Sequence, residues 1–169
     1  KGKAEEHKAK NIVIATGASA MGLPGVETDG EQVVTFWEAI LQEKLPKSVV
    51  VVGGGAIGLE FATVWNSYGV PVTVVELMDN IVPREDAEVS KELAKQLTKK
   101  GITVKTGTKV EGVEKLKTKL KVTVSGKDGE EILDADQVLV AIGFRPNSAN
   151  LGLDKIGVKL GKGGEIEVD

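Results

Sequence analysis

The sequence predicts an α/β fold in which a parallel sheet has helices on both faces. Residues 49–52 are four consecutive valines, which is typical of a strand buried on both faces of a sheet. A glycine-rich turn, an amphipathic helical pattern and a second apolar strand pattern follow directly. A strand, a helix and a strand joined by such short connections favour two parallel strands with a crossover helix between them.

The helix after the glycines is predicted to have one apolar face. Its apolar side chains fall within a narrow arc of the helical wheel, at Ile57, Phe61, Val64 and Tyr68. Gly69 is placed to end the helix, because glycine accepts the left-handed conformation found after helix C-termini. Residues 70–76 are therefore predicted to form a second strand, parallel to the first.

The same order then repeats once. Asp86 is placed to cap a second helix, and residues 102–105 are predicted to form the strand that follows it. Beyond residue 106 the apolar residues alternate within short segments, which predicts a three-stranded antiparallel meander beside the parallel sheet. Residues 138–142 are again apolar and are predicted to return to the centre of that sheet.

Composition excludes several classes of protein. The 169 residues suffice for one substantial domain, and the net charge of −3 argues against a general nucleic-acid binder. No apolar run approaches the roughly 18 residues of a membrane-spanning helix. The chain has no cysteine, which excludes a disulfide framework, a cysteine-ligated metal site and thiol chemistry by this chain. We therefore expect a cytoplasmic setting, no membrane association and no metal site.

The glycine turn has the spacing of a dinucleotide-binding loop. Gly53, Gly55 and Gly58 form the pattern G-x-G-x-x-G. The first glycine permits the tight turn, the second lets a pyrophosphate approach the backbone, and the third lets the helix pack on the sheet. The N–H groups at the helix start, with Ala56 and Ile57, are predicted to bind the anion. This pattern predicts a Rossmann-like fold that binds FAD or NAD(P).

Glu76 is the predicted anchor for the adenosine ribose. It ends the second strand, about 20 residues after the loop, where a carboxylate can accept hydrogen bonds from both ribose hydroxyls. We expect its side chain to be exposed at the sheet edge. A carboxylate repels the extra phosphate of NADP, and residues 77–80 supply no positive charge. NAD is therefore favoured over NADP, while FAD stays open on these residues alone.

Three stretches of the chain resemble the flavoprotein disulfide reductases. They are NIVIATGAS at residues 11–19, the glycine-loop unit at residues 49–76, and VAIGFRPN at residues 140–147. Within that family the chain is most similar to the dihydrolipoamide dehydrogenases, while mercuric reductases and NADH oxidases share the same motifs. The resemblance implies that this chain binds NAD and that FAD belongs to the full-length parent only.

The resemblance also implies a domain organisation in which an NAD-binding domain interrupts an FAD-binding domain. It assigns residues 1–45 to a tail of the FAD domain and linker, 46–147 to the NAD-binding domain, and 148–169 to the return to the FAD domain. The implied partners are NAD(H), the FAD and dimerisation domains of the parent, a second copy in a homodimer, and a 2-oxo acid dehydrogenase complex. The family's flavin glycine motif and redox-active cysteine pair have no counterpart here, so this chain alone is expected to be inactive.

Two further residues are assigned to the nicotinamide end by the resemblance. Glu60 matches a glutamate that pairs with a lysine of the FAD domain, and Gly143 matches a glycine beside the bound nucleotide. A purely structural interpretation stays open for both residues. Glu60 is also consistent with a first-turn glutamate favoured by the helix dipole, although the nicotinamide role is the one favoured, and Gly143 is equally consistent with a turn that ends a strand.

Two functions of other classes can be compared with this one. A short-chain dehydrogenase needs a Tyr-x-x-x-Lys pair, but Val72 stands four residues after Tyr68, the only tyrosine, so that function is excluded. A non-catalytic nucleotide-binding module agrees with the lack of a reactive group in the chain. The ATG and GxRPN stretches favour the enzyme domain instead.

Overall fold

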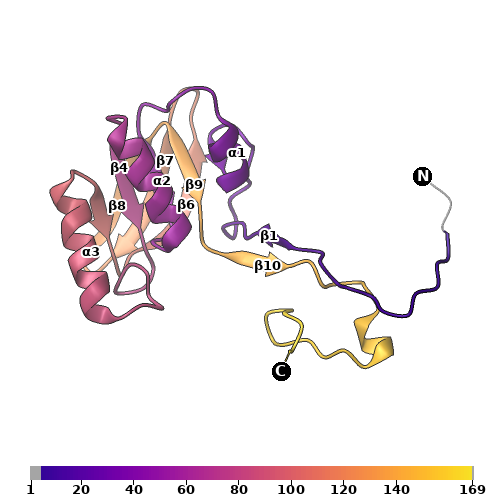
Figure 1. The fold of residues 1–169 in the computed structure, drawn as a ribbon. Coiled ribbons are helices and arrows are strands. Elements are labelled where there is room, and N and C mark those ends of the chain that lie inside the picture. The colour runs from indigo at the N-terminus through magenta and orange to yellow at the C-terminus, as the bar shows by residue number, and fades with distance from the viewer. Residues whose placement is uncertain (1–4, 169) are drawn as a thin grey trace. The chain divides into compact units, whose positions relative to one another are not determined.

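The computed structural model describes residues 5–168, which divide into two compact units. The larger unit, residues 20–144, contains a five-stranded parallel sheet in the order β2-β9-β3-β4-β5 (Figure 1). Its strands are β2 (Val33–Val34), β3 (Val49–Val52), β4 (Val72–Val75), β5 (Thr103–Lys105) and β9 (Gln137–Val140). Every neighbouring pair is parallel. The predicted parallel sheet is thus confirmed, with β3 at its centre and β9 inside the sheet between β2 and β3.

Three strands of this sheet end at the same level. Val52 is in register with Val75 of β4 on one side and with Val140 of β9 on the other. The chain leaves β3 towards β4, while β9 lies on the opposite side of β3. In open α/β sheets, ligands bind at the carboxyl ends of the strands where neighbouring connections diverge in this way. The glycine loop follows Val52 directly.

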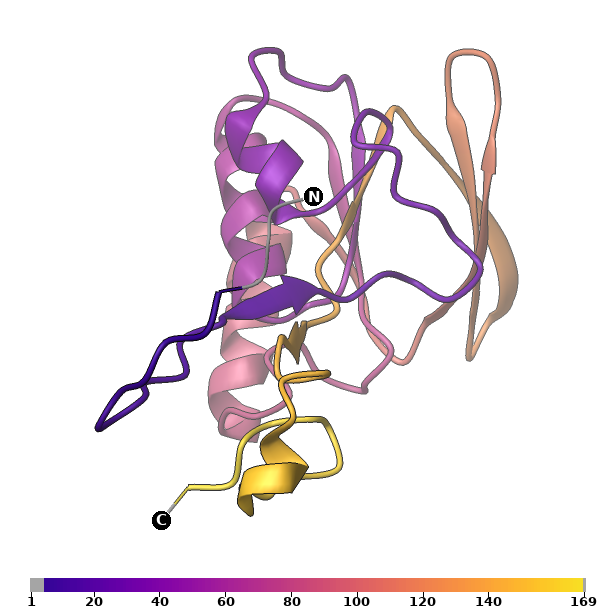
Figure 2. The same ribbon diagram turned by 90° about the vertical axis from the view of Figure 1, so that its right-hand side faces the viewer.

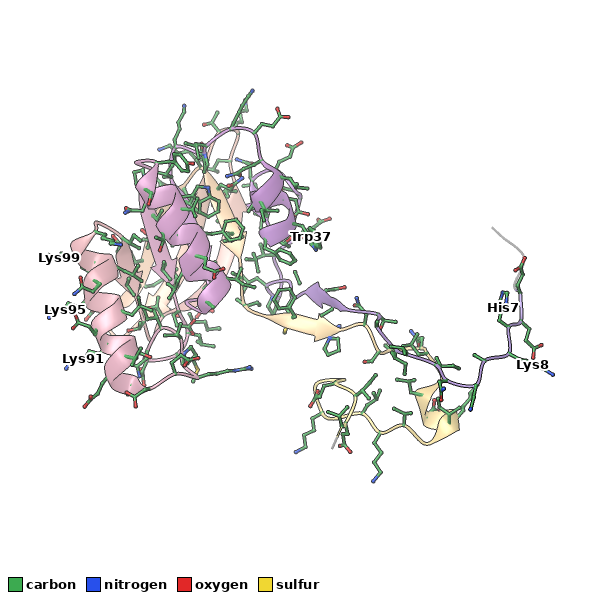
Figure 3. All side chains as sticks on the ribbon, viewed as in Figure 1. His7, Lys8, Trp37, Lys91, Lys95 and Lys99 are labelled. Carbon is green, nitrogen blue, oxygen red and sulfur yellow. The ribbon has the colours of Figure 1, made fainter. Side chains whose placement is uncertain are left out.

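One face of the sheet is covered by the helices α1 (Phe36–Leu41), α2 (Ala56–Ser67) and α3 (Ala87–Lys99), as Figure 2 shows. Asp86 caps α3 as predicted, with its carboxylate accepting the Glu88 N–H over 2.8 Å. The side of α3 that faces away from the sheet is polar. It carries three lysines that point away from the sheet, Lys91, Lys95 and Lys99 (Figure 3).

The other face of the sheet is covered by the antiparallel meander. Its strands are β6 (Lys109–Lys115), β7 (Leu120–Gly126) and β8 (Gly129–Ala135). Leu120, Val122 and Val124 alternate along β7 and pack in a common core with Val50 and Val138 of the sheet. The expected fold class is confirmed, but the helices lie on one face only. The meander takes the second face because its own apolar side needs a partner.

The buried side of α2 differs from the predicted one. Val64 is 51% exposed and Tyr68 is 69% exposed, whereas the buried residues of the helix are Gly58, Leu59, Ala62 and Trp65. The docking of Gly58 against the sheet sets this orientation, because it turns the small side of the helix towards β3. The outer apolar residues of the helix therefore stay partly in solvent.

Sequence patterns had not predicted β2 and α1. The signal was present as the capping pattern Thr35-x-x-Glu38, which marks a helix N-terminus. The Glu38 carboxylate accepts the Thr35 N–H over 2.8 Å, and Thr35 Oγ1 accepts the Trp37 N–H over 3.3 Å. Both elements belong to the same compact unit as the parallel sheet.

The smaller unit comprises residues 5–19 and 145–168. Strands β1 (Ala18–Ala20) and β10 (Phe144–Pro146) pair with each other, and a 3₁₀ helix, η1, covers Leu153–Ile156. Asn147 joins the two parts of this unit, because its N–H donates to the Gly17 carbonyl and its Nδ2 to the Thr16 carbonyl, over 3.0 and 3.1 Å. The ATG and RPN stretches are therefore neighbours. Among residues 5–168, no helix is both long and apolar enough to cross a membrane.

Candidate functional site

The first motif glycine sits where no side chain fits. Gly53 donates its N–H to the Val75 carbonyl over 2.9 Å, which extends the ladder between β3 and β4 by one residue. Its φ of +109° is a conformation that L side chains rarely adopt, and a Cβ here would collide with the Ala141 carbonyl oxygen. The tight turn predicted for Gly53 is therefore visible in the backbone itself.

The third motif glycine allows α2 to approach the sheet. A Cβ on Gly58 would collide with the Gly53 carbonyl oxygen and lie 3.1 Å from Cγ1 of Val51. The helix consequently begins directly above the end of β3. This close approach brings its N-terminus to the same sheet edge as the loop.

The second motif glycine faces open space. Gly55 is the N-cap of α2, with φ −77° and ψ 178°, and no side chain caps the helix. A Cβ on Gly55 would meet no described protein atom within 4 Å. Ala56 is exposed and Ile57 is half-buried in the first turn. The uncapped N–H groups of this turn and the helix dipole can bind an anion that approaches over Gly55.

Glu76 is buried rather than exposed, contrary to expectation. Its residue is 8% exposed, and its carboxylate accepts the Gly54 N–H over 2.6 Å and the Met78 N–H over 2.8 Å, one on each oxygen. The side chain turns back over the glycine loop, because the loop N–H beyond β3 has no strand partner. Each carboxylate oxygen retains a lone-pair site, so the group can still accept a hydroxyl of a bound ribose.

Glu60 and Gly143 lie at different parts of this edge. Glu60 is exposed in the second turn of α2, so the interpretation as a first-turn glutamate is wrong, because the helix begins only at Ala56. Gly143 follows β9 with φ +124°, and its carbonyl accepts the Met21 N–H over 2.9 Å. The segment before it borders the loop, since Gly53 approaches Ala141. β9 ends at Val140 and β10 begins at Phe144, so Gly143 lies between two strands and does not itself end one.

Sequence reasoning missed the middle residue of the glycine run. Gly54 is not part of the G-x-G-x-x-G spacing, yet it bonds both to Glu76 and, through its carbonyl, to the N–H of Val82 over 2.8 Å. The available signal was the run of three glycines, where the motif itself requires only the outer two. The site therefore combines an open anion cradle at Gly55 with a carboxylate at the neighbouring strand end. This arrangement suits the pyrophosphate and ribose of a dinucleotide.

Comparisons with known proteins agree with this geometry. The sequence profile of the pyridine nucleotide-disulphide oxidoreductase family matches residues 1–169. Dihydrolipoyl dehydrogenase from Rhizobium etli is 46% identical over 158 residues, covering 93% of this chain and 33% of the relative. Dihydrolipoyl dehydrogenase from Mycobacterium leprae is 48% identical over 160 residues, covering 94% and 34%. The chain thus spans about a third of the length of the curated relatives it matches.

Solved structures show the same likeness. LpdA from Mycobacterium tuberculosis superposes with a TM-score of 0.80 and 34% sequence identity, covering 91% of this chain and 33% of that chain. The HOCl-induced flavoprotein disulfide reductase RclA from Escherichia coli superposes with a TM-score of 0.76 and 28% identity, covering 91% and 35%.

Proposed function

The chain belongs to the pyridine nucleotide-disulphide oxidoreductase family, and from this membership we propose that it is the NAD(H)-binding domain of a flavin-dependent disulfide oxidoreductase of the dihydrolipoamide dehydrogenase type. One observation carries the proposal. The uncapped N-terminus of α2, the open side of Gly55 and the Glu76 carboxylate lie together at the carboxyl edge of a parallel sheet. These are the groups that a pyrophosphate and an adenosine ribose need.

Each predicted residue has a role in this proposal. The pyrophosphate lies over Gly55 and accepts the N–H groups of the first turn of α2. The ribose hydroxyls donate to Glu76. Glu60 and Gly143 flank the nicotinamide end, where hydride passes between NAD and the FAD of the parent protein. The substrate dithiol or disulfide reacts at a cysteine pair outside this chain, which itself has no cysteine.

NAD is the proposed nucleotide rather than NADP. The Glu76 carboxylate lies where the 2′-phosphate of NADP would be placed, and the two groups would repel each other. The structure does bring lysines near this end of the strand. Lys127 Nζ lies 3.8 Å from Asp79 Oδ1, and Lys105, which is in register with Val75, has its Nζ 2.7 Å from Glu131 Oε2. Each of these lysines already faces a carboxylate of its own, which offsets its charge. The local balance therefore still favours the ribose hydroxyls of NAD.

The wider assembly follows from the family in the same proposal. The parent protein adds FAD and dimerisation domains, forms a homodimer, and acts in the cytoplasm within a 2-oxo acid dehydrogenase complex. The alternatives are the corresponding domain of a related flavoprotein, such as a mercuric reductase or an NADH oxidase, and a non-catalytic nucleotide-binding module. The similarity to dihydrolipoyl dehydrogenases at 46 and 48% identity favours the first assignment.

Binding calorimetry with Gly55→Val tests the nucleotide site. The new side chain would meet no described protein atom near its Cβ, so the variant should fold normally and lose NADH binding by steric exclusion of the pyrophosphate. Gly112→Val in β6 is the matched control, because its Cβ also meets nothing within 4 Å and lies far from the loop in sequence. Unchanged NADH binding by a folded Gly55→Val chain would remove this loop from the proposal. Flavin retained in stoichiometric amount by the purified chain would overturn the choice of NAD over FAD.

A further inference from the structure

The connection between β4 and α3 holds the glycine loop from outside the nucleotide motif. Gly54 has no strand partner for either of its backbone groups. Its N–H donates to Glu76 Oε2 over 2.6 Å, and its carbonyl oxygen accepts the N–H of Val82 over 2.8 Å. Both partners belong to the segment of residues 76–82. Two hydrogen bonds of opposite direction therefore fix the peptide groups on either side of Gly54.

This segment is itself attached to the far side of the sheet. The Glu76 N–H donates to the Lys105 carbonyl over 2.8 Å, and the Glu76 carbonyl accepts the Thr108 N–H over 2.9 Å. The Met78 carbonyl accepts the Gly107 N–H over 2.8 Å. The segment is thus bonded to the end of β5 as well as to the glycine loop. The residues that bond to Gly54 are therefore held in place by the neighbouring strand.

Ile81 fills the space beneath Gly54. It is completely buried, and it belongs to the core between the sheet and the helices. A Cβ on Gly54 would lie 2.9 Å from Cγ2 of Ile81 and 3.1 Å from Cβ of Glu76. A side chain at position 54 would therefore force either Ile81 or the loop to shift. This tight contact explains why glycine stands at a position where the dinucleotide spacing requires none.

Val82 has a backbone conformation that β-branched residues rarely adopt. Its φ is +40°, in the left-handed region where a branched Cβ crowds the backbone. In this conformation its N–H points at the Gly54 carbonyl. Strained residues persist where surrounding contacts over-determine the backbone, and they gather at functional sites. The strain at Val82 accompanies the bond that fixes the loop.

We propose that residues 76–82 form a brace that holds the glycine loop in its nucleotide-receptive conformation before the nucleotide binds. Ile81 and Val82 act in it as positioning residues, through Gly54. The brace rests on the proposed function, since it treats this loop as the nucleotide site. A loop already held in its bound conformation loses less conformational entropy on binding, and the affinity for the nucleotide is higher for that reason.

A set of glycine and isoleucine variants of the 169-residue chain tests the brace. Gly54→Ala should make the Val82 amide exchange its hydrogen about tenfold faster in the nucleotide-free chain, and should weaken NADH binding by about tenfold, because the new Cβ pushes the loop away from Ile81. Ile81→Ala removes Cγ2 and should restore most of both losses in the double variant. Ile81→Val keeps the equivalent carbon and should restore neither.

Two controls separate the brace from the nucleotide contact. Gly55→Ala should leave hydrogen exchange of the free chain unchanged and weaken only NADH binding, since its Cβ faces open space. Gly112→Ala should change neither quantity. Failure of the wild-type chain to bind NADH would refute the proposed function, while the exchange rates of the free chain would still report on the brace. Wild-type exchange at Val82 in Gly54→Ala, or no recovery with Ile81→Ala, would overturn the brace.

If Gly54→Ala does not fold, the brace can still be tested with another variant, Glu76→Gln, and a second ligand. Glu76→Gln has nearly the same shape, but it removes the charge and replaces one carboxylate oxygen with an NH2 donor, so the side chain can no longer accept the N–H groups of both Gly54 and Met78. The probe is 2′,3′-dideoxy-ADP, which has a pyrophosphate but neither ribose hydroxyl. If Glu76 holds the loop, the Glu76→Gln chain should bind this probe about tenfold more weakly than the wild-type chain does. Equal affinity of both chains for the probe would overturn the brace and leave Glu76 as a ribose ligand only.

Discussion

Replacing Glu76 with alanine removes two interactions that the structure joins in one carboxylate. The side chain accepts the N–H groups of Gly54 and Met78 over 2.6 and 2.8 Å while the residue is 8% exposed. Each buried donor left without an acceptor costs about 1–3 kcal/mol. Water can enter the space of the lost side chain, so we expect the free energy of unfolding to fall by about 2–3 kcal/mol. A domain is stable by about 5–15 kcal/mol, so the variant should still fold.

The same substitution should change the choice between nucleotides. We take the ribose hydrogen bonds to contribute about 2 kcal/mol, which is roughly thirtyfold in affinity. The loosened loop weakens NADH and NADPH alike, because both carry the same pyrophosphate. That common loss cancels in the ratio of their dissociation constants. Glu76→Ala should therefore reduce the preference for NADH over NADPH by about thirtyfold, even though both nucleotides bind more weakly.

Urea unfolding at pH 7 measures the first effect, and titration calorimetry with NADH and NADPH measures the second. The calorimetry needs low and equal ionic strength, since salt screens the charge contribution. Glu85→Ala is the matched control, because it removes an exposed glutamate from the same connection and should change stability by less than about 0.5 kcal/mol. An unchanged nucleotide ratio in Glu76→Ala would refute the ribose role. A stability change below about 0.5 kcal/mol would refute the role of the two backbone contacts.

Two further predictions concern stability away from the loop. Partial burial opposes ionisation of Asp29, but Lys115 and the N–H groups of residues 31–33 outweigh it and hold the pKa of Asp29 well below its usual value. A depressed pKa stabilises the fold above the unfolded pKa of about 3.9, so Asp29→Asn should cost about 1 kcal/mol at pH 7 and progressively less below about pH 4. Urea titrations at pH 7 and 3 measure this difference, and an equal cost at both would contradict it. Leu139 in β9 is completely buried, so Leu139→Ala should lower the free energy of unfolding by about 2–5 kcal/mol. Ile132 is 56% exposed, and Ile132→Ala should lower it by less than about 1 kcal/mol. Equal losses of stability in thermal or urea unfolding would contradict the assigned core.

Local patterns predicted the elements around the loop well. The valine run matches β3 at both ends, and the Asp86 cap and the meander were found as expected. These features depend on residues close in sequence: a β-branched run, a capping carboxylate, and apolar residues at alternate positions. The spacing of Gly53, Gly55 and Gly58 likewise reports local backbone requirements. The sequence could therefore predict the candidate loop and the carboxylate beside it.

Other features escaped prediction because they depend on what packs where. The four apolar positions on α2 from Ile57 to Tyr68 looked like its buried face, but the close approach of Gly58 rotated the helix towards Ala62 and Trp65. The short β2 has no pattern of its own and is a strand only because it pairs with β9. Pairing between distant segments leaves little trace in a local pattern.

The sequence by itself determined that a glycine loop joins a buried strand to a helix, and that an acidic residue ends the next strand. Only the tertiary structure decided that this acid turns inward to hold Gly54, and that Ile81 and Val82 support the same residue. The spacing of the glycines depends only on the backbone conformation that one turn requires. The orientation of Glu76 depends instead on the N–H of Gly54, which has no strand partner and comes from another part of the chain. Such contacts form only when the strands are side by side.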